Sequence, residues 1–455
     1  MSRAFLEETA AVLDHGLGRE VKGWLALAIA ALAAAGVLAL IAVVARTPGL
    51  RELLPWPWQD FFPKIVITHV DLSIILWFLS LLGLFTVLAT ARATGGRPRG
   101  RVLGPVALNL TAGGAVLLVM PALFNWGDAS LNNYVPVLIH PLFYAGLGSM
   151  AFGVAGGVAR LLFNLPGYRA GPFEQGVAAT GVVFLMAIAC FGLAWAALPA
   201  GIEPALANER LFWGGGHVLQ FVNTLLMLVA WGILSEQATG TPPPRLFVAA
   251  VWSLAAAAVP GVAFYGLFDV LGREHREAFT QLLWYGLSLP PVVVMGWILT
   301  RFVSARRRLG WGETPALALL SSVVLFAVGG GLGYFLGVGD TRTPSHYHAV
   351  IGGVNLALMG VTVTVLLPLL RQSVPKGRWS LLLYGGGQLV FSLGLFAAGI
   401  MGVPRKTAGL EQGLDGTAKY LFMAVYGTGG LVAVMGGILF VWSAARCLWF
   451  PRGRP

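Results

Sequence analysis

Charged residues are scarce in this chain of 455 residues, because Lys, Arg, Asp and Glu together make up only 11% of it while hydrophobic residues make up 57%. That composition excludes a water-soluble domain with an ordinary polar surface, so lipid is the expected solvent for most of the chain. The net charge is +11, but the basic residues fall in short clusters between apolar runs rather than along one stripe. This distribution indicates membrane topology and argues against nucleic acid as a partner.

Cysteine is also rare. The two cysteines, Cys190 and Cys447, lie in separate apolar segments, which excludes a disulfide framework, a CxxCH heme-attachment site and a thiolate pair for copper. Long linkers and low-complexity tracts are lacking as well, and residues 1–20 are polar, so neither a second domain nor a cleaved leader is expected.

Long apolar runs are abundant. A membrane-spanning helix needs about 20 apolar residues, and we find such runs near 22–46, 65–91, 103–123, 135–159, 176–200, 211–235, 246–268, 279–303, 315–338, 344–370, 379–401 and 418–447. The predicted fold is therefore all-α, a polytopic bundle of about 12 transmembrane helices. We expect a cytoplasmic segment at 1–21, one transmembrane domain over 22–447 and a cytoplasmic tail at 448–455.

The orientation follows from the distribution of Lys and Arg. Of the 30 Lys and Arg residues, 20 fall in the N-terminus, the even-numbered loops, the C-terminus and the adjoining ends of the spans. Basic residues accumulate on the cytoplasmic side of membrane proteins. Both termini are therefore predicted to be cytoplasmic, in the inner membrane of a bacterium or archaeon.

The seven histidines are unevenly placed. Five of them fall near the start of spans that enter from the outer side: His69, His140, His217, His346 and His348. At a rise of ~1.5 Å per residue, they would share a layer roughly 6 to 12 Å below the outer surface. One such histidine is most simply a hydrogen-bonded core residue, but five with few carboxylates beside them indicate metal or cofactor ligation.

The spacing of His346 and His348 restricts how these two histidines can bind iron. Positions i and i+2 of a helix diverge by ~200°, so the two rings point to opposite sides and cannot chelate one iron. Each ring can instead hold a different heme, with His69 as the second axial ligand of one of them. That heme would be six-coordinate and low-spin, and the other would keep an open face.

Several segments then resemble subunit I of the heme-copper oxidase superfamily, and its B-type members most closely. The stretch Gly339-Asp-Thr-Arg-Thr-Pro-Ser-His-Tyr-His348, followed by Leu358-Met-Gly360 and Leu366-Leu-Pro368, is similar to that family's tenth helix. Phe212-Trp-Gly-Gly-Gly-His217 resembles its copper-ligand segment, Asn133 to Tyr144 resembles the start of the B-type fourth helix, and Met401-Gly-Val-Pro-Arg-Lys406 resembles a propionate-binding loop. The likeness runs in order from His69 to Lys406.

The resemblance implies roles for these residues. His69 and His348 would be the axial ligands of a low-spin heme, and His346 the proximal ligand of a high-spin heme. Arg405 and Lys406 would neutralise heme propionates, although an ordinary exposed basic loop is the alternative. Gly214, Gly215 and Gly216 would permit close approach either of a porphyrin or of a neighbouring helix.

The sequence departs from the family at the copper site, which needs three imidazoles. Only His217 remains, because Phe264 and Tyr265 fall where the family has paired histidines, and Phe221 replaces a tyrosine one turn beyond His217. We expect at most a weak distal metal at His217, and no tightly bound copper. His275 lies in the charged run Arg273 to Glu277, which is expected to be a solvated outer loop. His346, His217 and Tyr265 are the candidate residues at the reaction site.

These features favour a diheme oxidoreductase that passes electrons from a periplasmic cytochrome c or cupredoxin-like subunit II to a high-spin heme, where O2 or NO is bound or reduced. Other membrane subunits are compatible with this arrangement. Two alternatives stay open: a noncatalytic electron-transfer hemoprotein that has lost the copper site, and a twelve-helix transporter. The cytoplasmic halves of the spans offer hydroxyls but no inward carboxylate, so proton pumping is not expected.

Overall fold

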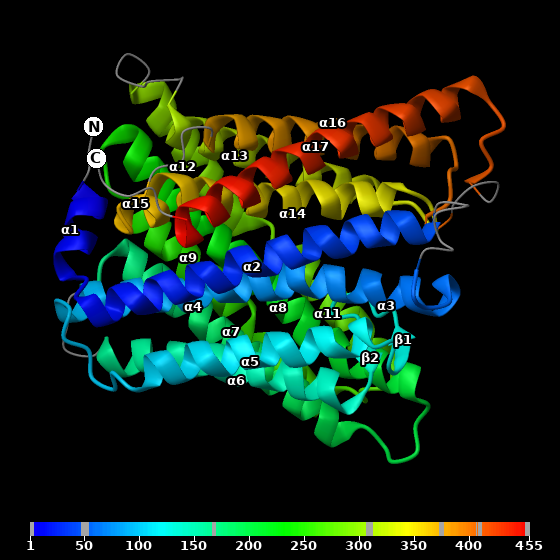
Figure 1. Cartoon of the computed structure of the whole chain (residues 1–455), viewed down its shortest axis with the longest axis horizontal. Helices are drawn as coiled ribbons and strands as arrows, with labels where there is room; N and C mark the ends of the chain where they lie inside the picture. The colour runs from blue at the N-terminus through cyan, green and yellow to red at the C-terminus, as the bar shows by residue number, and fades with distance from the viewer. Residues whose placement is uncertain are drawn as a thin grey trace. The chain divides into compact units, whose positions relative to one another are not determined.

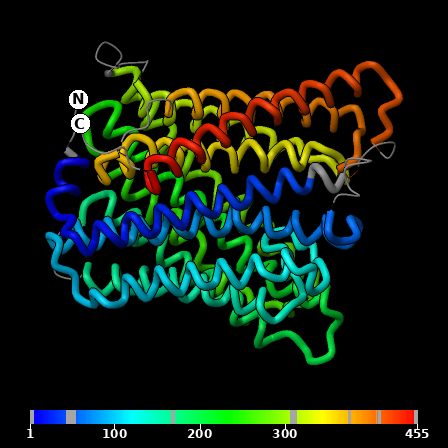
Figure 2. Tube along the Cα trace, viewed as in Figure 1, coloured from blue at the N-terminus to red at the C-terminus, as the bar shows by residue number. Residues whose placement is uncertain are grey.

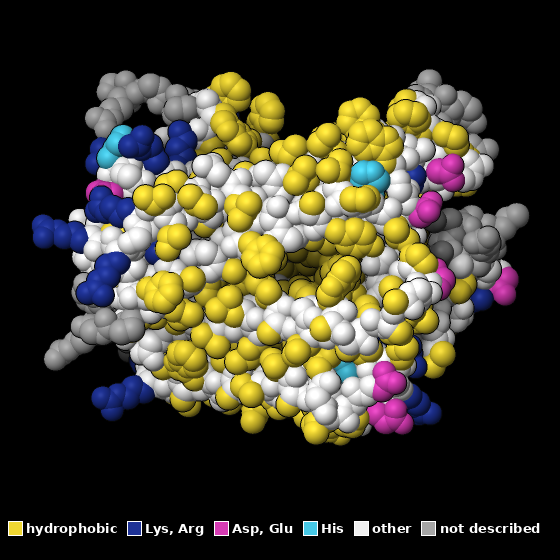
Figure 3. Space-filling model, turned by 90° about the horizontal axis from the view of Figure 1, so that it is seen from below, with side chains coloured by type: hydrophobic (Ala, Val, Ile, Leu, Met, Phe, Trp, Pro, Cys, Tyr) yellow, Lys and Arg dark blue, Asp and Glu magenta, His cyan; other side chains and the backbone are white. Residues whose placement is uncertain are grey.

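The computed structural model describes residues 4–46, 54–165, 170–305, 313–372, 377–405, 407 and 412–450. Within these ranges, twelve helices are long and apolar enough to cross a membrane. The prediction of an all-α, twelve-span protein is therefore confirmed. Hydrophobic side chains cover the middle of the face drawn in Figure 3, while Lys, Arg, Asp and Glu gather at its left and right edges.

Contacts divide the chain into two compact units. Unit 1 comprises Met1–Leu6, Ala230–Pro243 and Met295–Pro455, and unit 2 comprises Glu7–Val229 and Pro244–Val294. The boundaries fall inside the helices α1 (Ala4–Val12), α8 (Pro204–Thr239) and α12 (Leu289–Ala305), and between Pro243 and Pro244. The single transmembrane domain over 22–447 stays a prediction.

Unit 2 holds the amino-terminal helices and a small hairpin. Its elements are α1 (Ala4–Val12), α2 (His15–Arg46), α3 (Trp58–Val70), the π-helix η2 (Asp71–Leu76), α4 (Trp77–Thr94), α5 (Leu103–Leu123), β1 (Asp128–Ser130), β2 (Val137–Ile139), α6 (Pro141–Asn164), α7 (Pro172–Ala197), α9 (Arg245–Ala257), α10 (Val259–Leu267) and α11 (Arg273–Gly286). Helices α5 and α6 pack side by side, as do α2 and α4 (Figures 1 and 2). Strands β1 and β2 pair antiparallel, with Ala129 opposite Leu138.

Unit 1 holds the carboxy-terminal helices. They are α13 (Thr314–Leu332), the 3-10 helix η3 (Gly333–Phe335), α14 (Arg342–Val361), the π-helix η4 (Thr362–Leu366), α15 (Leu367–Leu369), α16 (Gly377–Ile400) and α17 (Thr417–Trp449). Helices α16 and α17 run along each other, and α14 packs against both α13 and α16. The neighbours of α14 on its two sides are therefore different helices.

Proline explains where two predicted spans are interrupted. The run predicted at 246–268 is divided into α9 and α10 at Ala258, two residues before Pro260. The run predicted at 279–303 starts earlier, at Arg273, and breaks after Gly286, ahead of Pro290 and Pro291. Because proline has no N–H to donate, it begins a new helix more readily than it continues one.

Several spans begin earlier than hydropathy alone indicated, two of them α2 and α3. Helix α2 starts at His15, and α3 starts at Trp58, so that Pro63 and Lys64 lie inside the second span. Lys64 is buried and donates from Nζ to the carbonyl oxygen of Asn125 at 3.0 Å and to its side-chain oxygen at 2.9 Å. A lysine whose ammonium group is hydrogen-bonded is tolerated inside a helical bundle. Helix α3 therefore includes Lys64, although the hydropathy pattern starts the span only at residue 65.

Candidate functional site

Helix α14 presents His346 and His348 to different neighbours. His346 Nδ1 lies 2.7 Å from the carbonyl oxygen of Gly329 on α13. The ring of His348 lies 4.8 Å, centroid to centroid, from the ring of Phe391 on α16. The two imidazoles thus face opposite sides of α14, as a spacing of two residues on a helix requires.

Three histidines share one hydrogen-bonding pattern at Nδ1. His346 meets the carbonyl of Gly329 as described, His69 Nδ1 lies 2.8 Å from the carbonyl oxygen of Ala35, and His217 Nδ1 lies 2.6 Å from that of Trp213. A carbonyl oxygen can only accept, so Nδ1 carries the proton in each ring and Nε2 keeps its lone pair. A neutral imidazole held in this tautomer is the form that binds a metal.

His69 also lies beside an irregular turn. Helix α3 passes directly into the π-helix η2, which begins at Asp71, two residues after His69. A π turn changes the direction in which the following side chains point, and such turns concentrate at functional sites. Asp71 is fully buried, and neither of its carboxylate oxygens has a hydrogen-bond partner among the described residues.

His217 lies on α8 and is enclosed by aromatic rings from several segments of unit 2. Its Nε2 lies 2.9 Å from the hydroxyl of Tyr134, which sits in the connection between β1 and β2. Burial raises the pKa of Tyr134, so the phenol stays protonated. It therefore donates a hydrogen bond to His217 Nε2. The rings of Trp213 and Phe279 lie 4.8 and 5.7 Å from the imidazole. A metal at His217 would first have to displace the Tyr134 hydroxyl.

The glycines before His217 admit these rings. A Cβ at Gly216 would overlap Tyr134, one at Gly215 would overlap Phe191, and one at Gly214 would overlap Tyr265 and Phe279. Each glycine therefore receives an aromatic side chain from a different segment of unit 2. Of the two explanations that the sequence left open for these glycines, close protein packing is the one the described contacts support.

His275 is the clearest correction to the sequence analysis. The charged run around it was expected to be a solvated loop, but Arg273 begins helix α11 and His275 is 0% exposed. Its ring lies 4.9 Å from the ring of Tyr265 and 5.0 Å from that of Phe279. The reason is amphipathicity: Arg273, Glu274 and Glu277 are exposed, while the opposite face of the same helix is buried.

His140 has a structural role that the sequence did not reveal. It precedes α6 as its N-cap residue, its Nδ1 accepts from the backbone N–H of Leu142 at 3.3 Å, and its ring stacks on Trp126. Helices α3 and α8 begin 11 and 13 residues before His69 and His217, whereas α14 begins four residues before His346. The common layer of five imidazoles stays a prediction.

The start of α14 is held by a polar segment. Arg342 donates through Nη2 to Asp340 Oδ2 at 2.7 Å, and this pairing lowers the pKa of the Asp340 carboxyl. Arg405 donates its backbone N–H to the carbonyl of Gly339 at 3.0 Å, so it lies beside the same carboxylate. Lys406 lies outside the described residues. The role predicted for Arg405 and Lys406 at heme propionates stays a prediction.

Sequence reasoning missed the roles of Tyr134 and of the Asp340–Arg342 pair. Tyr134 stands in the stretch that resembles the B-type fourth helix, yet nothing in the pattern indicated its contact with His217, which is 83 positions away. The Asp340–Arg342 pair lies in a quoted motif without a role. Within the described ranges, no three His, Cys, Asp or Glu side chains come together as a metal site.

The chain is similar to a known protein family and to two proteins of other organisms. The family model described as cytochrome c and quinol oxidase polypeptide I matches residues 19–433. An uncharacterized protein of Rickettsia prowazekii is 25% identical over 94% of this chain and 96% of its own length. An uncharacterized protein of Aquifex aeolicus is 28% identical over 74% of this chain and 82% of its own length.

A solved structure has a similar fold. It is a heme-copper terminal oxidase dimer, which aligns with a TM-score of 0.74 over 97% of this chain and 86% of that chain. The sequence identity is 14%, so this likeness concerns the fold alone.

Proposed function

The chain belongs to the cytochrome c and quinol oxidase polypeptide I family, subunit I of the heme-copper oxidases, and from this premise we propose that it is a diheme oxidoreductase of the bacterial or archaeal inner membrane. The family is one of membrane-embedded electron-transport proteins with heme cofactors. Membership leaves the twelve-helix transporter without support. In the proposal, electrons enter from a periplasmic cytochrome c or cupredoxin-like subunit II and reach a second heme that binds O2 or NO.

The observation that carries the proposal is the state of the imidazoles. His69 and His346 each hold Nδ1–H against a backbone carbonyl, which leaves Nε2 as a lone-pair donor. Heme iron takes such a neutral imidazole as its axial ligand. The residues present therefore fit the cofactor that the family implies.

We assign His69 and His348 to the low-spin heme and His346 to the high-spin heme. When bound, the hemes supply the one-electron chemistry and the open iron position. The backbone carbonyls of Ala35 and Gly329 fix the direction of the rings of His69 and His346. Both hemes would be held by helix α14, because His346 and His348 lie on it.

The surroundings of His217 favour a more limited chemistry than four-electron reduction of oxygen. His217 Nε2 accepts from Tyr134. The resemblance to the family puts Phe264 and Tyr265 where paired histidines would be expected. Fewer than three protein ligands rarely hold a first-row metal tightly. We therefore propose that no copper is tightly bound there. A noncatalytic electron-transfer role is the second candidate, because the Tyr134–His217 hydrogen bond occupies the nitrogen that a metal would need.

Spectra of the purified protein test the proposal. Reduced-minus-oxidised spectra with and without carbon monoxide should show one low-spin heme and one heme that binds the gas, with iron present and copper absent. His348→Ala should abolish the low-spin signal, and His346→Ala should abolish carbon monoxide binding. His15→Ala, which changes an exposed histidine at the start of α2, is the control and should leave both signals unchanged.

Two results would decide against parts of this proposal. A colourless wild-type protein that gains no heme on reconstitution would refute it entirely. Two hemes without consumption of O2 or NO under a supplied electron donor would favour the noncatalytic role.

A further inference from the structure

Unit 2 contains a group of buried polar atoms that have no hydrogen-bond partner among the described residues. They lie where α8 begins, where α10 ends and where α11 begins. Arg210 is 8% exposed and His275 is 0% exposed. The atoms without a hydrogen-bond partner are Arg210 Nε and Nη1, Arg276 Nε, both ring nitrogens of His275 and Tyr265 Oη.

These side chains are neighbours. Arg210 interacts electrostatically with Arg276 and with His275. The ring of Tyr265 meets the ring of His275 edge to face, at 4.9 Å and 65°. Phe279 lies beside both His275 and His217, so the group borders the His217 site.

The group is unbalanced in both charge and hydrogen bonding. A guanidinium carries five donors and no acceptor, and two guanidiniums close enough to interact electrostatically repel. Burying a charge without a partner costs several kcal/mol, by an order-of-magnitude estimate, so proteins almost always pair it. A negatively charged acceptor would satisfy the guanidinium donors and could also accept from the Tyr265 hydroxyl and from one ring nitrogen of His275.

The carboxylates nearby do not fill this role. Asp269 acts on His275 through its charge, but its Oδ1 accepts the backbone N–H of Leu271. Glu277 pairs with the exposed Arg273 on the outer face of α11. Glu209 acts on Arg210 electrostatically, yet Arg210 Nε and Nη1 have no hydrogen-bond partner among the described residues.

Helix α11 adds a second attraction for an anion. It begins at Arg273 and has 14 residues, so His275 and Arg276 stand in its first turn. The backbone N–H groups of a first turn have no partner within the helix, and the helix dipole places partial positive charge there. Side chains and backbone thus favour the same ligand.

We propose that Arg210, His275 and Arg276, with the hydroxyl of Tyr265, bind an anion beside His217, chemically a carboxylate or a small oxyanion. This site goes beyond the proposed diheme function and does not depend on it. The same chemistry could come from two sources, a carboxylate carried by a bound cofactor or a free anion from solution. A guanidinium pair binds either by charge-assisted hydrogen bonds.

Thermal unfolding of the full chain in detergent tests the free-anion source. Sodium acetate and sodium phosphate are titrated against sodium chloride at equal ionic strength. Wild type should show a saturable rise in Tm with acetate or phosphate, because a ligand that binds only the folded state stabilises it. Arg210→Gln and Arg276→Gln should lose that rise. Arg273→Gln, which removes an exposed charge from the same helix, should keep it.

The cofactor source has its own readout. If the anion is a carboxylate of a bound heme, added salts should leave Tm unchanged, while Arg210→Gln and Arg276→Gln lower the midpoint potential of that heme and Arg273→Gln does not. Because Arg276 is only half-buried, its variant keeps the test valid even if Arg210→Gln fails to fold. The proposal is overturned if neither readout distinguishes Arg210→Gln and Arg276→Gln from Arg273→Gln. Absence of heme would refute the diheme function and leave the salt titration intact.

Discussion

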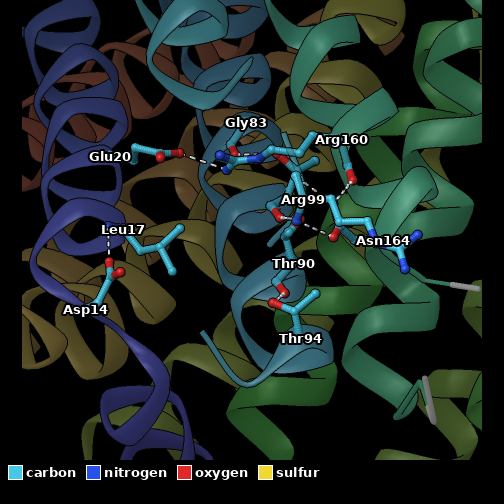
Figure 4. Close-up of polar contacts among 10 residues, drawn as sticks. Asp14, Leu17, Glu20, Gly83, Thr90, Thr94, Arg99, Arg160 and Asn164 are labelled. Carbon is cyan, nitrogen blue, oxygen red and sulfur yellow. Dashed lines mark hydrogen bonds and ion pairs between the residues drawn. The ribbon is translucent and has the colours of Figure 1, made fainter. Parts of the chain in front are cut away.

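Removal of the carboxylate of Glu20 is the perturbation whose cost the structure defines best. Arg160 Nη2 on α6 donates to Glu20 Oε2 on α2 at 2.7 Å, as Figure 4 shows. The two side chains are 1% and 9% exposed. Both lie over Gly104 of α5, where any Cβ would overlap them. The close approach of three helices thus depends on a charge pair at a glycine.

The expected cost follows from what remains after the change. Arg160 Nε and Nη1 already have no partner among the described residues, so Glu20→Gln leaves a buried guanidinium without a counter-charge. Breaking a buried pair from one side costs about 3–5 kcal/mol. An exposed pair is worth only about 0–1 kcal/mol. The Arg273–Glu277 pair, whose side chains are 78% and 51% exposed, provides that comparison.

Denaturant titration of the purified protein in mixed micelles measures the difference. Glu20→Gln should lower the free energy of unfolding by about 3–5 kcal/mol, and Glu277→Gln by less than about 1 kcal/mol. The double variant Glu20→Met with Arg160→Met should recover most of the loss, since it leaves no unpaired charge. Equal costs for Glu20→Gln and Glu277→Gln would refute the reasoning, as would a double variant less stable than Glu20→Gln.

Two further predictions concern α14 and α8. Hydrogen bonds from Arg342 lower the pKa of Asp340, so their stabilisation is present above the unfolded value of about 3.9 and is lost as the pH falls through the folded value. Asp340→Asn should therefore cost about 1 kcal/mol near neutral pH and nothing in strong acid, as measured by unfolding across pH; a cost independent of pH would contradict this. A methyl group at Gly216 would overlap Tyr134, so Gly216→Ala should cost about 1–3 kcal/mol by overpacking. Gly192→Ala on α7, where a Cβ meets nothing within 4 Å, is the control, and an equal Tm shift in both variants would count against the packing explanation.

Much of the fold could be predicted because membrane spans are recorded in local composition. Twelve apolar runs became twelve long helices, and the two interrupted spans contain proline at Pro260 and at Pro290. The opposite directions of His346 and His348 were also predictable, since they follow from helical periodicity alone. Helix starts were less predictable, because a polar residue such as Lys64 can be buried once a distant partner satisfies it.

The candidate site was predictable only in part. The types and order of its histidines were visible in the sequence, but their partners come from segments far along the chain. Tyr134 reaches His217 through a β-hairpin that no apolar pattern indicated. The charged neighbours of His275 in the sequence predict a solvated residue. In the structure only one face of α11 carries those charges, and His275 lies on the other.

The amino-acid sequence by itself determined that this chain spans a membrane twelve times and that His346 and His348 face opposite sides of one helix. These properties depend on composition and on the spacing of residues within one segment. Only the tertiary structure decided that a tyrosine engages His217 and that Arg210 and His275 are buried beside each other. Such contacts join segments that are remote in sequence, and they form where helix packing leaves room for them, which no local pattern specifies.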